Sequence, residues 1–380
     1  MNELRKIHTR VRPRWYRPAA AGWFLTSIFS LGFGLTTACG GDDDESCAGC
    51  GSGGSGAGVS DSGTAGSAGG GGTGDAGLDS GADTSIVVDG GGAFPDGNIY
   101  VAGSRNAKVY EFDANLNPVS DWTHPAFGTV MPAPGQPFGD GPAGMVFDAK
   151  GRLVVAGVDQ FCIFSKPGVV VECHPKTKSQ PTENVIFDLA GNLYTTTATG
   201  GTDEIHKYDA NYTYLTTFKM PTGNLTGVTC DPDGNLYIGS QLGGGAGSAI
   251  YKVDKVTLKP LDTLNIAGNV EGLQFAADGN ILAAVGSGVG VVRITPKSPT
   301  TVISTITDPG LFFAVPLTID NTGLIYTADY ENGSGTALAD LFVFDSTGAV
   351  KASKLPSEIY GPFGMVVAGA VLPCGAYQPR

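Results

Sequence analysis

Cysteine is the residue type in this sequence with the clearest capacity for chemistry. The 380-residue chain contains seven: Cys39, Cys47, Cys50, Cys162, Cys173, Cys230 and Cys374. Cys162 and Cys173 fall on two successive short apolar segments, so we expect a disulfide across two neighbouring strands. Cys230 has the surroundings of a small buried apolar residue, and its pairing with Cys374 stays open. Cys47 and Cys50 form either a local disulfide or two free thiols.

The common catalytic motifs are absent from the sequence. It contains no Gly-x-Ser-x-Gly, no His-Glu-x-x-His and no phosphate-binding Gly-Lys-Ser/Thr. The histidines after residue 93 are scattered, and the alternating pattern around His206 favours a packed or surface residue over a general base. A net charge of −13 and a pI near 4.6 argue against nucleic-acid binding. Chemistry must therefore come from residues that the fold brings together.

A short segment recurs six times in the second part of the chain. Its glycines lie 40 to 54 residues apart, at Gly97, Gly151, Gly191, Gly234, Gly279 and Gly323. Around each glycine the pattern is a tight Asp-x-x-Gly turn or a variant of it, followed by a short apolar run. A repeat of this length, made of short apolar runs and turn residues, is typical of a β-propeller.

Each repeat predicts four strands. An almost continuously apolar inner strand precedes the turn, a second strand follows it, and then come a third strand ending in aspartate and a looser outer strand. The first repeat lacks an inner strand, but residues 361–368 carry that pattern at the other end of the chain. We therefore predict an all-β, six-bladed propeller of four-stranded blades over residues 94–380, closed by this C-terminal strand.

The motif Asp-x-x-Gly-Asn-Leu-Tyr, followed by a strand ending in Phe-Asp, resembles the NHL-type propellers and the senescence-marker-protein/gluconolactonase family. In that family the position before each inner strand supplies oxygen ligands to a divalent cation in the central channel. Here that column consists of Ala143, Glu183, Thr226, Glu271, Val315 and Phe363. The resemblance implies Glu183 and Glu271 as metal ligands, with a bound water as nucleophile. The alternative is that both glutamates are solvated residues of the rim or partners of backbone amides.

The first 93 residues indicate export and anchoring. Residues 1–38 combine a basic segment with an uncharged apolar one and end in small residues before Cys39, an order that predicts a bacterial secretory signal with Cys39 as lipid acceptor. It resembles a lipoprotein signal; an uncleaved anchor helix is the alternative. Residues 39–93 are rich in Gly, Ser and Asp and predict a disordered linker. Gly40, in place of the aspartate that retains such proteins at the inner membrane, implies the outer membrane of the bacterial cell envelope.

Three long loops are predicted on one face of the propeller, at residues 125–142, 241–248 and 330–340. Extended loops on one face of a regular scaffold form a typical binding surface. We therefore predict a monomeric, lipid-anchored, extracytoplasmic binding module that presents this face to a protein, peptide or glycan, with no nucleic-acid partner. The alternative is a metal-dependent, lactonase-like hydrolase with one divalent cation in the channel.

Overall fold

The computed structural model describes residues 94–128, 141–157, 159–176, 182–197, 204–220, 224–241, 248–286, 288–330, 339–354, 359–369 and 374. The expected signal (1–38) and linker (39–93), with Cys39, Cys47 and Cys50, lie outside these residues, as does most of each long loop predicted above. Within the described ranges, no helix has the length and apolar character needed to cross a membrane.

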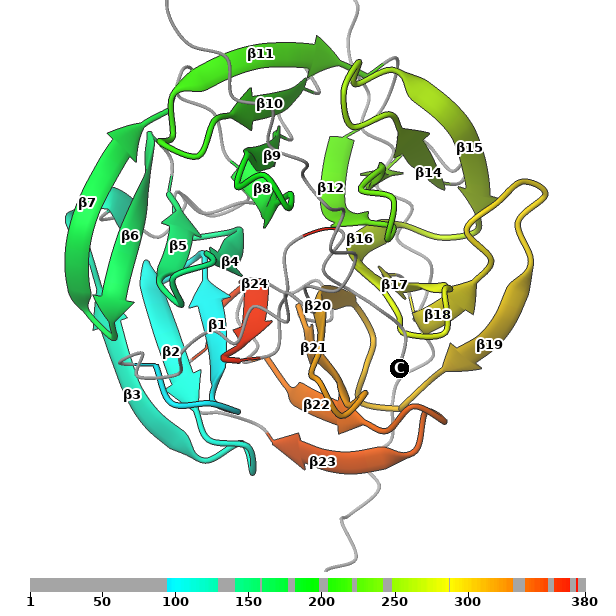
Figure 1. The fold of residues 1–380 in the computed structure, drawn as a ribbon. Coiled ribbons are helices and arrows are strands. Elements are labelled where there is room, and N and C mark those ends of the chain that lie inside the picture. Colours follow the sequence, from blue (N-terminus) through cyan, green and yellow to red (C-terminus); the bar gives the residue numbers. More distant parts are fainter. Residues whose placement is uncertain are drawn as a thin grey trace, which may run out of the picture. The chain divides into compact units, whose positions relative to one another are not determined.

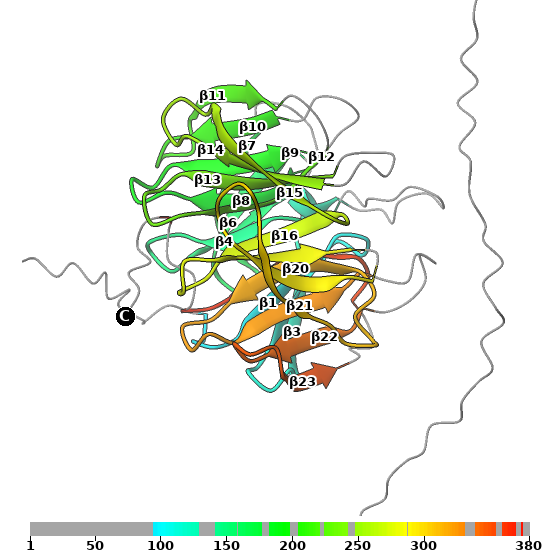
Figure 2. The ribbon, with the colours of Figure 1, turned by 90° about the vertical axis from the view of Figure 1, so that its right-hand side faces the viewer.

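The described strands form six antiparallel sheets of four strands, arranged as blades around a central channel (Figure 1). This arrangement confirms the predicted six-bladed propeller. Apart from the strands, a single turn of 3₁₀ helix, η1 (Pro125–Phe127), follows the first blade. Figure 2 shows the blades from the side, with their strands running between the two faces of the ring.

The strands occupy equivalent places in each blade. The inner strands are β24 (Pro362–Val367), β4 (Met145–Phe147), β8 (Thr182–Phe187), β12 (Asn224–Cys230), β16 (Val270–Phe275) and β20 (Ala314–Ile319). The second strands are β1 (Ile99–Gly103), β5 (Leu153–Ala156), β9 (Leu193–Thr197), β13 (Leu236–Gln241), β17 (Ile281–Val285) and β21 (Ile325–Asp329). The third strands are β2 (Lys108–Phe112), β6 (Gln160–Lys166), β10 (Glu204–Tyr208), β14 (Ser248–Val253), β18 (Gly290–Ile294) and β22 (Leu341–Phe344). The outer strands are β3 (Pro118–Thr123), β7 (Val169–Pro175), β11 (Tyr214–Lys219), β15 (Pro260–Ile266), β19 (Val302–Ile306) and β23 (Val350–Lys354).

The ring closes through its two sequence-distant ends. Strand β24 pairs antiparallel with β1, so the C-terminal strand supplies the inner strand of blade 1. This pairing confirms the prediction that residues 361–368 complete the first blade. Blades 1 to 6 are numbered here by their second strands, from β1 to β21. The top face is the one where the inner strands begin, and the bottom face is the one where they end.

The turns on the bottom face explain the repeated sequence motif. After β8, the Asp188 carboxylate accepts the backbone N–H and the side-chain amide of Asn192 at 2.8 and 2.7 Å, and the Tyr194 hydroxyl at 3.0 Å. Gly191 closes the turn with φ +81°, a conformation that glycine adopts without strain. Aspartate, glycine, asparagine and tyrosine recur together because one carboxylate ties the turn to a buried ring. The turns therefore have a structural role.

The hydrophobic core lies between the blades. Each pair of neighbouring blades encloses its own cluster of buried side chains, so six separate clusters surround the channel. The cluster between blades 1 and 2 is the richest in aromatic rings, with Tyr100, Trp122, Phe147 and Phe164 fully or almost fully buried. Because each blade is held from both sides, its inner strand is fixed relative to its neighbours. That rigidity positions the residues at the top of the channel.

In the described part of the chain, two disulfides cross-link strands or segments of the propeller. Cys162 and Cys173 are directly opposite in β6 and β7 and are bonded, the pairing expected from the sequence. Cys230, at the lower end of β12, is bonded to Cys374, whose backbone N–H also donates to Phe187 O at 2.9 Å. Cys374 is therefore fastened at the bottom of the channel between blades 3 and 4, and it lines the lower part of the channel cavity.

Candidate ligand site at the channel mouth

A β-bulge recurs at the top of the inner strands. The pairing of β8 with β9 skips Glu183, that of β16 with β17 skips Glu271, and that of β24 with β1 skips Phe363. The register also shifts around Thr226 in β12 and around Val315 in β20. A bulge removes a residue from the ladder and re-aims its side chain. The column predicted from the sequence is therefore built on a bulge repeated around the channel.

Glycines next to this column let the inner strands approach one another. A Cβ on Gly227 would lie 2.5 Å from the backbone nitrogen of Leu273 in the next blade, and one on Gly272 would lie 2.4 Å from Val315 O. Gly364 is as crowded, with a Cβ 1.9 Å from Ala143 O. The mouth is narrow because its strands touch at positions without side chains. The sequence carries this signal as a glycine directly after the column residue in several blades, and sequence reasoning did not use it.

Three successive blades contribute polar residues to the mouth. Glu183, Thr226 and Glu271, from blades 3, 4 and 5, are exposed by only 7, 4 and 8%. The Thr226 hydroxyl donates to Val270 O at 2.7 Å and so ties two blades together. The Gln241 amide lies 2.6 Å from both carboxylate oxygens of Glu271, to which it donates. The structure thus brings together the two glutamates singled out from the sequence, and it adds Gln241, which sequence reasoning missed.

Both glutamates are held in an environment that disfavours their charge. Burial raises the pKa of Glu183 to about 8. The pKa of Glu271 is raised well above its ordinary value, first by burial and then by the negative charge of Glu183, against the opposing hydrogen bond from Gln241. Among the described residues, Glu183 has no hydrogen-bond or ion-pair partner. A buried carboxyl without a partner is costly to the fold.

Lys176, close in sequence to Glu183, already donates two hydrogen bonds. Lys176 Nζ donates to Gly157 O at 2.7 Å and to Thr182 Oγ1 at 2.9 Å, and so links blade 2 to the first residue of β8. Burial lowers the pKa of Lys176 to about 7, although the charge of Asp159 opposes this. Lys176 is not among the groups that shift the pKa of Glu183. These two hydrogen bonds hold the start of β8.

The opposite side of the mouth is aromatic. Phe363 in blade 1 contacts Tyr330 edge to face, with ring centroids 5.1 Å apart, and Tyr330 in turn lies 6.1 Å from Phe313. The Asp329 carboxylate fixes this wall by accepting the backbone N–H groups of Phe312 and Phe313. The Arg105 guanidinium stacks on the Tyr330 ring at 5.1 Å. Three rings from blades 1 and 6 therefore form one wall.

Below the mouth the channel narrows to a small cavity. Its volume is about 80 Å³, and all six inner strands line it, from Phe363 at the upper end to Asp320 at the lower end. Such a volume holds a few waters or a small group. A larger ligand would have to sit at the mouth.

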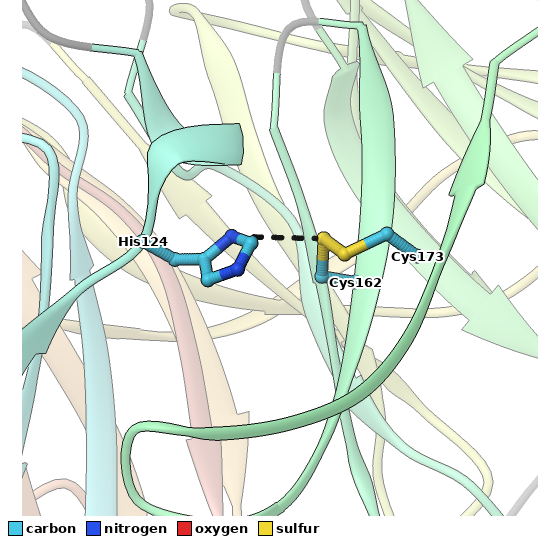
Figure 3. A group of neighbouring side chains, drawn as sticks. All are labelled: His124, Cys162 and Cys173. Carbon is cyan, nitrogen blue, oxygen red and sulfur yellow. Dashed lines mark hydrogen bonds between the residues drawn. A yellow bond between two sulfur atoms is a disulfide. The ribbon is translucent and has the colours of Figure 1, made fainter.

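The other candidate residues are used structurally. His124, Cys162 and Cys173 lie within 4.8 Å of one another (Figure 3), but the two sulfurs are bonded to each other and supply no thiolate. His124 Nδ1 accepts the Ala126 N–H at the start of η1, and burial lowers its pKa. His206 is buried and lies 3.0 Å from the Glu204 carboxylate, in line with the packed role expected from the sequence.

Comparison with known proteins establishes the fold. No family model matches the sequence, and no curated protein matches it. A protein of unknown function from Bacteroides caccae matches with a TM-score of 0.56 at 14% identity, covering 71% of this chain and 98% of its own. A luciferin-regenerating enzyme matches with a TM-score of 0.50 at 14% identity, covering 71% and 94%. A proposed gluconolactonase matches with a TM-score of 0.46 at 15% identity, covering 61% and 86%. The first two similarities show a shared propeller fold.

Proposed function

We propose that this propeller is a binding protein whose ligand sits at the top mouth of the central channel. The observation that carries the proposal is Glu183, which is more than nine-tenths buried and has no partner among the described residues. Folded proteins pair their buried ionisable groups or use them in function. A ligand that pairs with Glu183 would complete the site.

The alternative is a metal-dependent hydrolase with a divalent cation between Glu183 and Glu271. Hard cations require several oxygen ligands in a suitable geometry. In the described column, the Thr226 hydroxyl donates to Val270 O, and Asn184 Oδ1 accepts the Val185 N–H at 2.8 Å. Two carboxylates remain, and aromatic or aliphatic side chains occupy the opposite side. The residues present do not complete such a metal site, so binding is the better-supported function.

The test of the proposed function compares two buried glutamates of blade 3. We expect Glu183→Gln to raise the melting temperature of the full-length protein at pH 8, because the substitution removes a carboxyl that has no partner. Glu204→Gln is the matched control, since Glu204 pairs with His206 at 3.0 Å and with Lys219 at 3.6 Å, and its loss should lower the melting temperature. A lower melting temperature in Glu183→Gln would mean that Glu183 has a structural role, and the proposal would fail.

We also propose that Cys39 carries a lipid that anchors the protein in the bacterial cell envelope. The order of basic, apolar and small residues before Cys39 supports this. Expression of the full chain with a radioactive fatty acid should label the protein, and Cys39→Ala should abolish both the labelling and the recovery of the protein with membranes. Unchanged membrane recovery of Cys39→Ala would favour an uncleaved anchor helix.

A further inference from the structure

The mouth of the channel is divided into two chemically different halves. Around the ring, the column residues of blades 3, 4 and 5 are Glu183, Thr226 and Glu271, whereas blades 6 and 1 contribute Val315 and Phe363. Blade 1 lies opposite blade 4 in the ring, as the positions of β24 and β12 show (Figure 1). A ligand at the mouth therefore meets two carboxyls on one side and an aromatic wall on the other.

The polar half of the mouth favours the binding of a positively charged group. Glu183 has no partner among the described residues, and the Gln241 amide at 2.6 Å is the hydrogen-bond donor that the structure places on the Glu271 carboxylate. An amide neutralises no charge. Two buried carboxyls that repel each other bind a cation favourably because it removes both the desolvation cost and their repulsion.

The apolar half decides which kind of cation fits. Phe363, Tyr330 and Phe313 offer ring surfaces, and the Tyr330 hydroxyl is the one oxygen among their side chains. A hard metal ion gains little from such a wall, whereas an organic ammonium gains cation–π attraction and buries its carbon skeleton there.

We propose that the ligand is an organic ammonium ion with an apolar or aromatic body, bound by Glu183 and Glu271 through its nitrogen and by the Phe363–Tyr330–Phe313 wall through its carbon skeleton. The inference rests on the proposed function of the mouth as a binding site. A primary ammonium has three N–H donors and no acceptor, which suits two carboxylates facing one space. The ammonium can belong to a free amine or to a lysine side chain in a peptide.

Calorimetric titration of the full-length protein with 2-phenylethylammonium tests the proposal. We expect saturable one-to-one binding, with 2-phenylethanol, which has the same shape without the charge, at least about tenfold weaker, a difference of about 1.4 kcal/mol. Glu183→Gln should weaken ammonium binding by a similar factor, and so should Glu271→Gln if Glu183→Gln fails to fold. The exposed-site control Glu172→Gln should bind like the wild type.

A second set of titrations identifies the source of the ammonium and separates the ways of failing. A short uncharged peptide with one central lysine should bind more tightly than free 2-phenylethylammonium if the natural ligand is a peptide, and more weakly if it is a free amine. Equal binding of the alcohol and the ammonium, or ammonium binding unchanged in Glu183→Gln, would overturn the proposal. Binding of calcium or magnesium without ammonium would overturn it in favour of a metal site. If Glu183→Gln is nonetheless stabilised at pH 8, the proposed function survives and only the ligand class fails.

Discussion

The two ends of strand β8 carry acids in opposite situations. At the bottom, the Asp188 carboxylate accepts three hydrogen bonds, from the Asn192 backbone, the Asn192 side chain and Tyr194. At the top, Glu183 is more deeply buried than Asp188 yet has no partner among the described residues. The bottom acid is placed for stability, and the top acid is held at a cost to stability. This contrast is the basis for proposing the ligand site at the top face.

The largest effect is expected at the bottom of the channel, where the Cys230–Cys374 disulfide closes a loop with a sequence separation of 144. The chain-entropy model gives the greatest stabilisation to long loops, so the Cys230→Ala/Cys374→Ala variant should lose about 4 kcal/mol of unfolding free energy. The Cys162→Ala/Cys173→Ala variant, with a separation of 11, should lose less. Denaturant unfolding checks both. A larger loss from the short loop would contradict the assignment of the Cys230–Cys374 bond as the more stabilising disulfide.

The next effect concerns the bottom turn itself. Asp188→Ala removes the acceptor of the Asn192 N–H and leaves the buried Tyr194 hydroxyl with Lys255 O at 3.3 Å as its remaining acceptor. The loss should cost about 3 kcal/mol. Denaturant unfolding at pH 7 measures it. A change in unfolding free energy below about 0.5 kcal/mol would show that water replaces the carboxylate. The bottom turns would then not have the structural role assigned to them.

Two glycines allow a third comparison of the faces. Gly227→Ala, beside the top column, places a Cβ 2.5 Å from Leu273 N in the next blade and should cost about 2 kcal/mol through displacement of backbone. Gly279→Ala, in a bottom turn with open space but φ +79°, should cost about 1 kcal/mol. Thermal unfolding of both variants gives the ranking. The reverse ranking would show that the inner strands are not packed as tightly as the structure indicates.

The remaining effect is a gain in stability that depends on pH. Burial raises the pKa of Glu183 from 4.5 to about 8 in the folded protein, so on raising the pH the unfolded chain loses this proton first. The folded state therefore loses stability between about pH 4.5 and pH 8. Glu183→Gln should leave stability unchanged at pH 4 and raise it at pH 8. A pKa raised from 4.5 to about 8 corresponds to ~4 kcal/mol, less the cost of burying the glutamine amide. A gain at pH 4 of the same size would attribute the effect to packing.

The sequence predicts the fold because the repeat is local. Each Asp-x-x-Gly turn satisfies its own hydrogen bonds within a few residues, and the missing inner strand of the first repeat appears again at residues 361–368. The cross-strand Cys162–Cys173 pair follows from the same local register.

The candidate site is only partly readable from the sequence. Aligning the repeats places Glu183 and Glu271 in one column, but the Gln241 amide reaches Glu271 from another blade. The aromatic wall joins Phe363 to Tyr330, and these residues become neighbours only when the ring closes. The Cys230–Cys374 bond likewise depends on where the chain passes after β24. Contacts between blades have no signature in a repeat that describes one blade.

The protonation state of Glu183 is the most direct test of the contrast between the two faces. Carbon-13 NMR of the full-length protein labelled at glutamate side-chain carboxyls would follow this group, with its resonance identified by its loss in Glu183→Gln. The account predicts a titration midpoint of about 8 for Glu183, which moves downward when 2-phenylethylammonium is added. A midpoint at the ordinary value of 4.5 in the absence of ligand would mean that Glu183 is already paired or solvated, and it would contradict the assignment of the channel mouth as a ligand site.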